Sequence, residues 1–157
     1  MKKGIAFTAG IVLIGLIIML LMPGITDKSQ AKSAAKEVLE NVIDQNYEKA
    51  FESVYFYDRA TDLEPVISYK DAKEEWIQRV KDLRNNGIYI VDYKRLRVVL
   101  DDTYPVGTVD LVLSMNGKKT VKENVRLWFG ERDGKWKVGD LNYNKEEQWA
   151  KLLSGRM

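Results

Sequence analysis

The chain opens with an uninterrupted apolar run and then changes to periodic patterns. Residues 4–22, GIAFTAGIVLIGLIIMLLM, form a run of 19 residues without a charge. At about 1.5 Å of rise per residue, a helix of this length spans roughly 28 Å, close to the hydrocarbon thickness of a bilayer. Pro23-Gly24 follows, and this pair is typical of a helix end. The pattern predicts a transmembrane helix, with residues 1–26 forming the membrane anchor and a short link.

The flank of this run predicts its orientation. Lys2 and Lys3 precede it, and basic residues next to a membrane helix stay on the cytoplasmic side. We therefore expect a single-pass protein of the cell membrane. Its N-terminus would be cytoplasmic, and residues 27–157 would form one extracytoplasmic domain.

Two alternatives to a retained anchor are open. A cleaved signal peptide would release the domain as a secreted protein, but it would have a shorter apolar region and small residues at the cleavage site. A buried core helix would have a polar face, which residues 4–22 lack. The pattern favours the anchor over both.

Helical periodicity follows the link. Apolar residues spaced i, i+3, i+4 and i+7 predict an amphipathic helix over residues 31–43. Asn46 is a typical N-cap for a second helix over residues 47–55, which has the same spacing. Ser68 has an acidic residue three positions later, which predicts the start of a third helix that ends near residues 85–87.

From residue 88 the period changes to two, which predicts β-strands. Strands are expected over residues 88–100 and 106–115, with a third around residues 121–129 and a fourth around residues 136–138. The alternation predicts that the inward side chains are Leu96, Val98, Leu100, Val109, Leu111, Leu113, Met115, Val121, Val125, Leu127 and Phe129.

The turns between these strands support a meander. Asn116-Gly117 and Asp133-Gly134 are typical two-residue hairpin turns, because both central residues of such a turn need a positive φ. A short helix with Trp149, Leu152 and Leu153 on one side follows the last strand. Helices grouped before strands predict an α+β domain: three helices packed on a curved four-stranded antiparallel meander, and a short C-terminal helix.

The net charge of the domain argues against nucleic-acid binding. The chain has 25 basic and 23 acidic residues, a net charge of +2. Lys2 and Lys3 account for this excess, so the domain itself is neutral. A general nucleic-acid-binding protein is expected to carry excess positive charge. We therefore expect no nucleic-acid partner.

Cysteine and histidine are both absent. Their absence excludes a thiolate nucleophile, the Ser-His-Asp and Cys-His arrangements, and the usual zinc sites. We therefore predict no catalytic, cofactor-binding or metal-ligating residue, and we expect no cofactor and no enzymatic activity. An all-carboxylate metal site and an acid–base site of Asp, Glu and Tyr are compatible with the composition.

Three segments of the domain carry a family resemblance. They are the helical pair that includes residues 46–51 (NYEKAF), the helix that contains Trp76, and residues 133–138 (DGKWKV). Their order resembles the superfamily of nuclear transport factor two, ketosteroid isomerase and the SnoaL-like proteins, often called cystatin-like. The likeness covers residues 31–141.

This resemblance implies a fold but no single function, because the superfamily includes enzymes, carriers, dimerisation modules and scaffolds. With one N-terminal membrane helix, the chain is most similar to the bacterial extracytoplasmic branch. That branch includes small envelope proteins, an extension domain of some penicillin-binding proteins, and inner-membrane scaffolds of secretion and conjugation machines. The resemblance predicts an accessory or scaffold protein of the bacterial cell envelope, acting by protein–protein interaction or self-association.

Two candidate sites follow. The resemblance implies a conical cavity between helices and sheet, where a small ligand or an isomerase-like reaction is the alternative function. The candidates for its lining are Tyr55, Tyr57, Asp58, Trp76 and Tyr104. The second site is the outward sheet face, where Arg and Trp side chains around Asp110 would form either a partner surface or an ordinary solvated face. Its candidate residues are Arg95, Arg97, Lys122, Arg126 and Trp128.

Overall fold

A computed structural model of the chain describes residues 26–59, 65–141 and 147–157. The predicted anchor, residues 4–22, lies outside the described residues. Within those residues, no helix is both long enough and apolar enough to span a membrane.

The helices precede the sheet, as the periodicity predicts. The N-terminal helix is described over residues 26–43. It is followed by α2 (Tyr47–Phe51) and α3 (Tyr69–Asn85), and the 3-10 helix η1 (Gln148–Leu152) lies near the C-terminus. Ser68 caps α3 as predicted, because its hydroxyl accepts a hydrogen bond of 3.2 Å from the backbone N–H of Asp71.

The second helix is shorter than its apolar spacing predicts. Asn46 is its N-cap residue, but the Asn46 side chain makes no capping hydrogen bond. The helix ends at Phe51, and Val54 forms a parallel bridge to Val138 instead. Apolar spacing cannot distinguish these outcomes, because a side chain buried against a strand fits either backbone conformation.

The strands are β1 (Ile88–Asp101), β2 (Tyr104–Met115), β3 (Lys118–Arg132) and β4 (Lys135–Leu141). They form one antiparallel sheet in the order β1-β2-β3-β4, which confirms the predicted α+β fold with its four-stranded meander. Each hairpin closes with a two-residue turn.

Both predicted turn motifs adopt the expected conformation. Asn116 and Gly117 have φ values of 51° and 79°, and Asp133 and Gly134 have values of 54° and 69°. Two positive φ angles in succession define a type I′ turn, whose twist matches that of the strands. The first hairpin turns at Asp102, whose φ is 58°.

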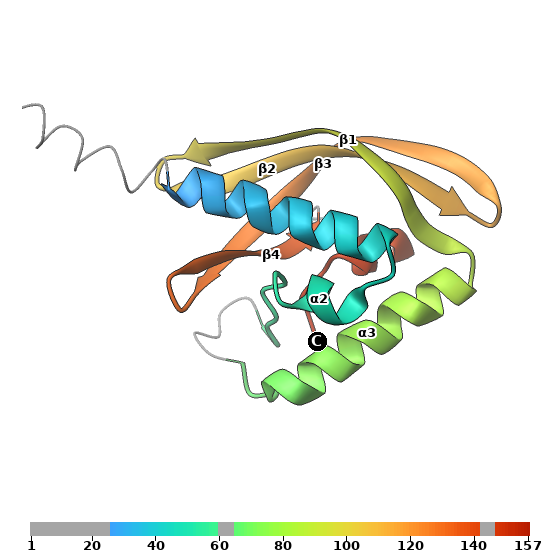
Figure 1. Ribbon diagram of the computed structural model, residues 1–157, viewed down its shortest axis with the longest axis horizontal. Helices are drawn as coiled ribbons and strands as arrows, with labels where there is room; N and C mark the ends of the chain where they lie inside the picture. Colours follow the sequence, from blue (N-terminus) through green and yellow to red (C-terminus); the bar gives the residue numbers. More distant parts are fainter. Residues whose placement is uncertain (1–25, 60–64, 142–146) are drawn as a thin grey trace, which may run out of the picture.

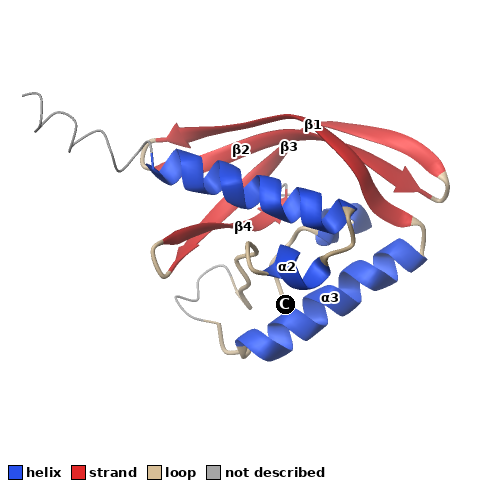
Figure 2. Ribbon diagram, viewed as in Figure 1, coloured by secondary structure: helices blue, strands red, loops and turns tan. Residues whose placement is uncertain are grey.

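The sheet curves around the helices, which lie on its concave side (Figures 1 and 2). The core lies between these two layers and includes Trp76 from α3, Leu111 from β2 and Phe129 from β3. We call the opposite side of the sheet the outer face. No helix of the described part of the chain covers it (Figure 2).

The two edges of the sheet differ. The β4 edge is covered by residues 53–57, where the Tyr55 N–H donates to Val138 O at 2.7 Å. The C-terminal segment adds a further bond of 2.8 Å from the Gly155 N–H to Gly139 O. At the other edge, β1 pairs only with β2 among the described segments.

One β-bulge makes two sequence predictions wrong. The register moves from Val109↔Val125 to Leu111↔Lys122, and Asn124 within the bulge has a φ of 52°. The bulge inserts one extra residue, so every side chain beyond it changes face.

Val121 and Lys122 therefore exchange the faces predicted for them. Val121, expected inside, pairs with Val112 on the outer face and is 55% exposed. Lys122, expected outside, lies on the concave side, where its Nζ is 2.8 Å from a carboxylate oxygen of Glu147 and 5.3 Å from the centre of the Trp149 ring.

Candidate functional site

An apolar row crosses the outer face of the sheet. Val99 of β1 pairs with Val106 of β2, which pairs in turn with Trp128 of β3. Because directly opposed residues share a face of the sheet, the three side chains form one line. Val99 is 55% exposed and Trp128 is 41% exposed. We call Val99, Val106 and Trp128 the apolar row.

The Trp128 indole is held in place by its surroundings. It lies against the backbone of Gly139 in β4, where an added Cβ would overlap the ring. Tyr55 and Tyr57 meet the indole edge-on, with ring centres 5.7 and 5.8 Å away. This packing orders an aromatic side chain whose surface is partly open to solvent. Ordered, partly exposed aromatic groups are typical anchors of protein interfaces.

A second row, parallel to the first, carries positive charge. Arg97 pairs with Thr108, and Thr108 pairs with Arg126. The side chain of Arg126 is 3.9 Å from a carboxylate oxygen of Asp101 and is half exposed. We call Arg97, Thr108 and Arg126 the basic row. The outer face therefore offers apolar contact area beside two guanidinium groups.

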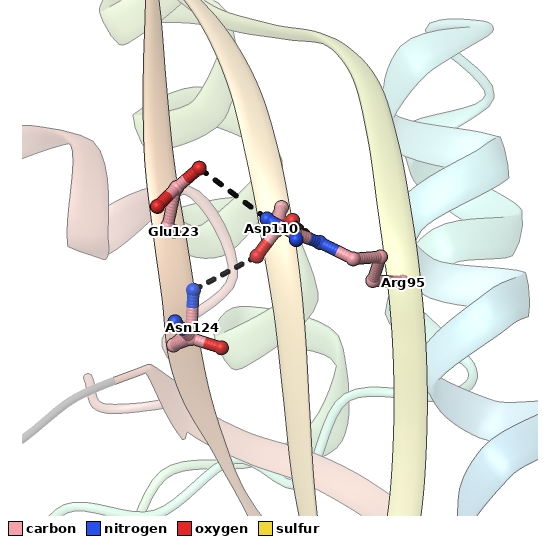
Figure 3. A network of polar contacts seen from close by, with 4 residues as sticks. All are labelled: Arg95, Asp110, Glu123 and Asn124. Atoms are coloured by element: carbon pink, nitrogen blue, oxygen red, sulfur yellow. Dashed lines mark hydrogen bonds and ion pairs between the residues drawn. The ribbon is translucent and has the colours of Figure 1, made fainter.

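A network of polar contacts lies next to the basic row (Figure 3). Asp110 of β2 is 4% exposed, although it projects from the outer face. Its carboxylate accepts a hydrogen bond from the Arg95 guanidinium and another, of 2.9 Å, from the backbone N–H of Asn124. Arg95 also contacts Glu123 at 3.3 Å.

Asp110 joins the two irregular segments of the sheet. Arg95 has a φ of 55° and lies where β1 changes register, and Asn124 lies in the β3 bulge. The hydrogen bond from the Asn124 N–H, together with the charge of Arg95, holds the pKa of Asp110 below its ordinary value, against the effect of burial. We infer that this carboxylate fixes the shape of the outer face.

Replacing Asp110 with asparagine is expected to lower the melting temperature by several degrees at neutral pH, because the ion pair with Arg95 is lost. A carboxyl group whose folded pKa is depressed stabilises the fold above about pH 4, and that stabilisation disappears as the pH falls through the folded value. Wild type and variant should therefore converge below pH 4. Thermal unfolding followed by circular dichroism measures both effects.

The matched control is Glu131→Gln, which removes an exposed carboxylate from β3. It should change the melting temperature little at either pH. A constant difference between wild type and Asp110→Asn from pH 7 to pH 3 would contradict the assigned role of this carboxylate.

The structure brings together part of the predicted partner surface. Arg97, Arg126 and Trp128 lie in the two adjacent rows, and Arg95 lies beside them in the network with Asp110. Lys122 is on the other face. Val99 and Val106 belong to the surface but were missed, although strict alternation between the inward Val98 and Leu100 would have found Val99.

The five candidates for a cavity lining lie in different places. Trp76 is completely buried in the core, and Tyr104 lies at the first hairpin, where its ring meets that of Trp136. Tyr55 and Tyr57 pack against Trp128 at the edge of the outer face. The carboxylate of Asp58 accepts hydrogen bonds from the backbone N–H groups of residues 66 and 67, so it is engaged by the segment that precedes α3.

The grooves on the described part of the chain were compared with these five candidates. Four open grooves have volumes of about 530, 450, 350 and 310 Å³, and none of the four is lined by any of the five residues. Nor does the described part of the chain contain three acidic side chains grouped closely enough to hold a metal ion.

Among the tyrosines that the structure describes, Tyr57 has the most strongly raised pKa. Its hydroxyl donates a hydrogen bond of 2.9 Å to Asp140. Burial, and then the charge of Asp140, raise the pKa of Tyr57 above its usual value. A phenol with a raised pKa stays neutral, so it serves here as a structural hydrogen-bond donor.

Comparison of the chain with protein-family models, with curated proteins and with solved structures found no match.

Proposed function

We propose that the chain is a single-pass, membrane-anchored accessory or scaffold protein of the bacterial cell envelope. Its cystatin-like domain would bind a protein partner through the outer face of the sheet. The observation that carries the proposal is the apolar row beside the basic row, on the face that no described helix covers.

The chemistry of these rows supports a protein partner. Trp and Arg are enriched among the residues that contribute most to interface affinity, particularly where surrounding side chains hold them in place. Trp128 has Tyr55 and Tyr57 at its edge, and Arg126 is half exposed beside it. Two guanidinium groups next to apolar area suit a partner segment with acidic and apolar side chains.

The experiment compares wild type with an Arg126→Glu/Trp128→Ala variant of the full chain. Both are crosslinked in the membranes of expressing cells and captured under denaturing conditions. We expect at least one partner to fall about tenfold in the variant, since each 1.4 kcal/mol of lost interaction energy reduces binding tenfold.

The matched control is Lys81→Glu/Val66→Ala, which makes the same change of charge and removes an exposed apolar side chain away from the sheet. Val66 is 89% exposed, and Lys81 is exposed on α3. The control should retain every partner. An identical partner set in wild type and in the Arg126→Glu/Trp128→Ala variant would refute the outer face as the binding surface.

A further inference from the structure

The last five residues of β1, Arg97–Asp101, form a regular strand edge without a neighbour. They pair with β2 in continuous register, from Arg97↔Thr108 to Asp101↔Tyr104. No backbone hydrogen bond joins them to any other described segment. Exposed strand edges bind further strands, and proteins normally protect them.

Protection is present elsewhere on the sheet. The first half of β1 contains two register shifts and the exposed charges of Asp92, Lys94 and Arg95, which are devices that discourage edge pairing. The β4 edge is covered by residues 53–57 and by the C-terminal segment. Arg97–Asp101 therefore stands out as the regular, uncovered edge in the described sheet.

The backbone of this edge presents bonding groups to solvent. In a two-residue hairpin the closing pair, here Asp101–Tyr104, exchanges hydrogen bonds, and bonded and non-bonded pairs then alternate along the ladder. Leu100 then faces Pro105 in a non-bonded pair, which agrees with the missing N–H of proline. Leu100 and Val98 consequently direct their N–H and C=O groups to the open edge.

The sequence of this edge is complementary to itself. When two antiparallel copies are centred on Val99, Arg97 of each copy lies opposite Asp101 of the other. Val99 faces Val99, and Val98 faces Leu100. The charged pairs and the central pair lie on the outer face, because residues two apart share a face. Shifting the register by two residues in either direction moves Arg97 away from Asp101, and the shift that would bring Arg95 opposite Asp101 requires pairing through the irregular segment at Arg95.

We infer that two copies of this chain associate through β1, by antiparallel pairing of Arg97–Asp101 about a two-fold axis at Val99. The pairing forms four cross-strand backbone hydrogen bonds, two in each Val98–Leu100 pair, and two symmetric Arg97–Asp101 ion pairs. A strand this short gives modest affinity in dilute solution. Two copies tethered to one membrane would meet at a high effective concentration, which favours pairing.

This association would also extend the proposed partner surface, and in that respect the inference rests on the proposed function. Val99 is the β1 end of the apolar row. Pairing at Val99 joins the apolar rows of the two copies end to end into one stripe, with a Trp128 at each end. The β1 edge is thus paired with β1 of a second copy. The protein partner binds the outer face that the two copies share.

Cysteine crosslinking tests the pairing directly, because the chain has no cysteine of its own. In a non-bonded antiparallel pair the Cα atoms are about 4.5 Å apart, which lies within the range that a disulfide accepts. Full-length Val99→Cys protein in membranes, treated with a mild oxidant, should run mostly as a covalent dimer on a non-reducing gel.

Val121→Cys is the matched control, since Val121 has the same 55% exposure on the same face but lies on β3, away from the open edge. It should stay monomeric under the same conditions. Equal crosslinking of the two variants would overturn the inference.

Charge reversal tests the register. Arg97→Asp or Asp101→Arg, each added to Val99→Cys, should reduce crosslinking several-fold, and the two reversals together should restore it. Failure of the double reversal to restore crosslinking, in protein whose circular dichroism is unchanged, would overturn the proposed register. The result is separable from the proposed function, because Arg126→Glu/Trp128→Ala should lose the partner while Val99→Cys still crosslinks in that background.

Discussion

Replacing Trp76 with alanine is expected to lower the free energy of unfolding by about 3–5 kcal/mol. Trp76 is completely buried and packs against Phe51 of α2, with the ring centres 5.7 Å apart. Alanine would leave a cavity between α3, α2 and the sheet, where the neighbours cannot all move in to fill it. Urea unfolding followed by fluorescence and circular dichroism measures the loss.

A phenylalanine at the same position gives the informative comparison. The indole Nε1–H of Trp76 is buried, and it has no hydrogen-bond partner among the described residues. An unpaired buried donor carries a desolvation cost of about 1–3 kcal/mol. Phenylalanine removes that donor and still fills most of the space, so the net loss should stay within about 1 kcal/mol.

The two variants therefore separate two contributions of Trp76 to stability, the packing of its ring and the burial of its N–H group. A Trp76→Phe protein as unstable as Trp76→Ala would mean that the indole N–H makes a stabilising hydrogen bond. Tyr104→Phe is a suitable control, since Tyr104 is 64% exposed and should tolerate the change with little effect. The sequence alone could not predict the role of Trp76. An aromatic residue on a helix can line a cavity or fill the core, and only its packing distinguishes the two.

Local chemistry made much of the fold predictable. Ser68 before Asp71, and the two turns Asn116-Gly117 and Asp133-Gly134, each impose a specific backbone conformation through their own residue types. The structure contains all three as predicted. The change of period near residue 88 located the sheet for the same reason, since a half-buried strand must alternate.

The predictions that were wrong concern features that depend on contacts between residues far apart in the sequence. Nothing near Asn124 in the sequence announces a bulge, because the bulge is stabilised by the carboxylate of Asp110 on the neighbouring strand. Strict alternation was extended past the bulge, so it predicted the wrong faces for Val121 and Lys122. The available signal for the bulge was Asp110, an acidic residue among the apolar residues of β2, because a buried carboxylate needs hydrogen-bond or charge partners.

The candidate site was also predictable only in part, where it lies on regular strand segments. Arg97, Arg126 and Trp128 follow from alternation on regular strand segments, and the structure places them together. The contacts of Tyr55 and Tyr57 with Trp128 were not predictable, because they require residues 53–57 to leave the helical layer and cover the β4 edge. The C-terminal segment also covers the β4 edge, and Arg79 of α3 holds that segment.

Replacing Arg79 with alanine is expected to lower the free energy of unfolding by about 2–4 kcal/mol. The guanidinium of Arg79, on α3, donates to the backbone oxygens of Ser154 and Arg156 at 2.5 and 2.6 Å. Burial lowers the pKa of Arg79, but a guanidinium stays protonated at any physiological pH. The side chain thus bridges α3 to the C-terminal segment with two charge-assisted hydrogen bonds.

The loss should be concentrated at the C-terminal segment. The N–H groups of Gly155 and Met157 bond to Gly139 and Tyr57, so they report on whether this segment stays docked. In Arg79→Ala these two amides should exchange with solvent much faster, while amides in β2 keep their protection. Hydrogen exchange resolved by residue measures this difference.

Arg79→Lys and Lys81→Ala complete the comparison. A lysine ammonium is a point charge on a flexible stem, and it cannot hold two carbonyl oxygens with the fixed geometry of a guanidinium. Arg79→Lys should therefore recover only part of the lost stability. Lys81→Ala removes an exposed charge from the same helix and should leave both amides protected. Retained protection at Gly155 and Met157 in Arg79→Ala would show that the segment docks without the arginine, and the covering of the β4 edge would then depend on its backbone pairing.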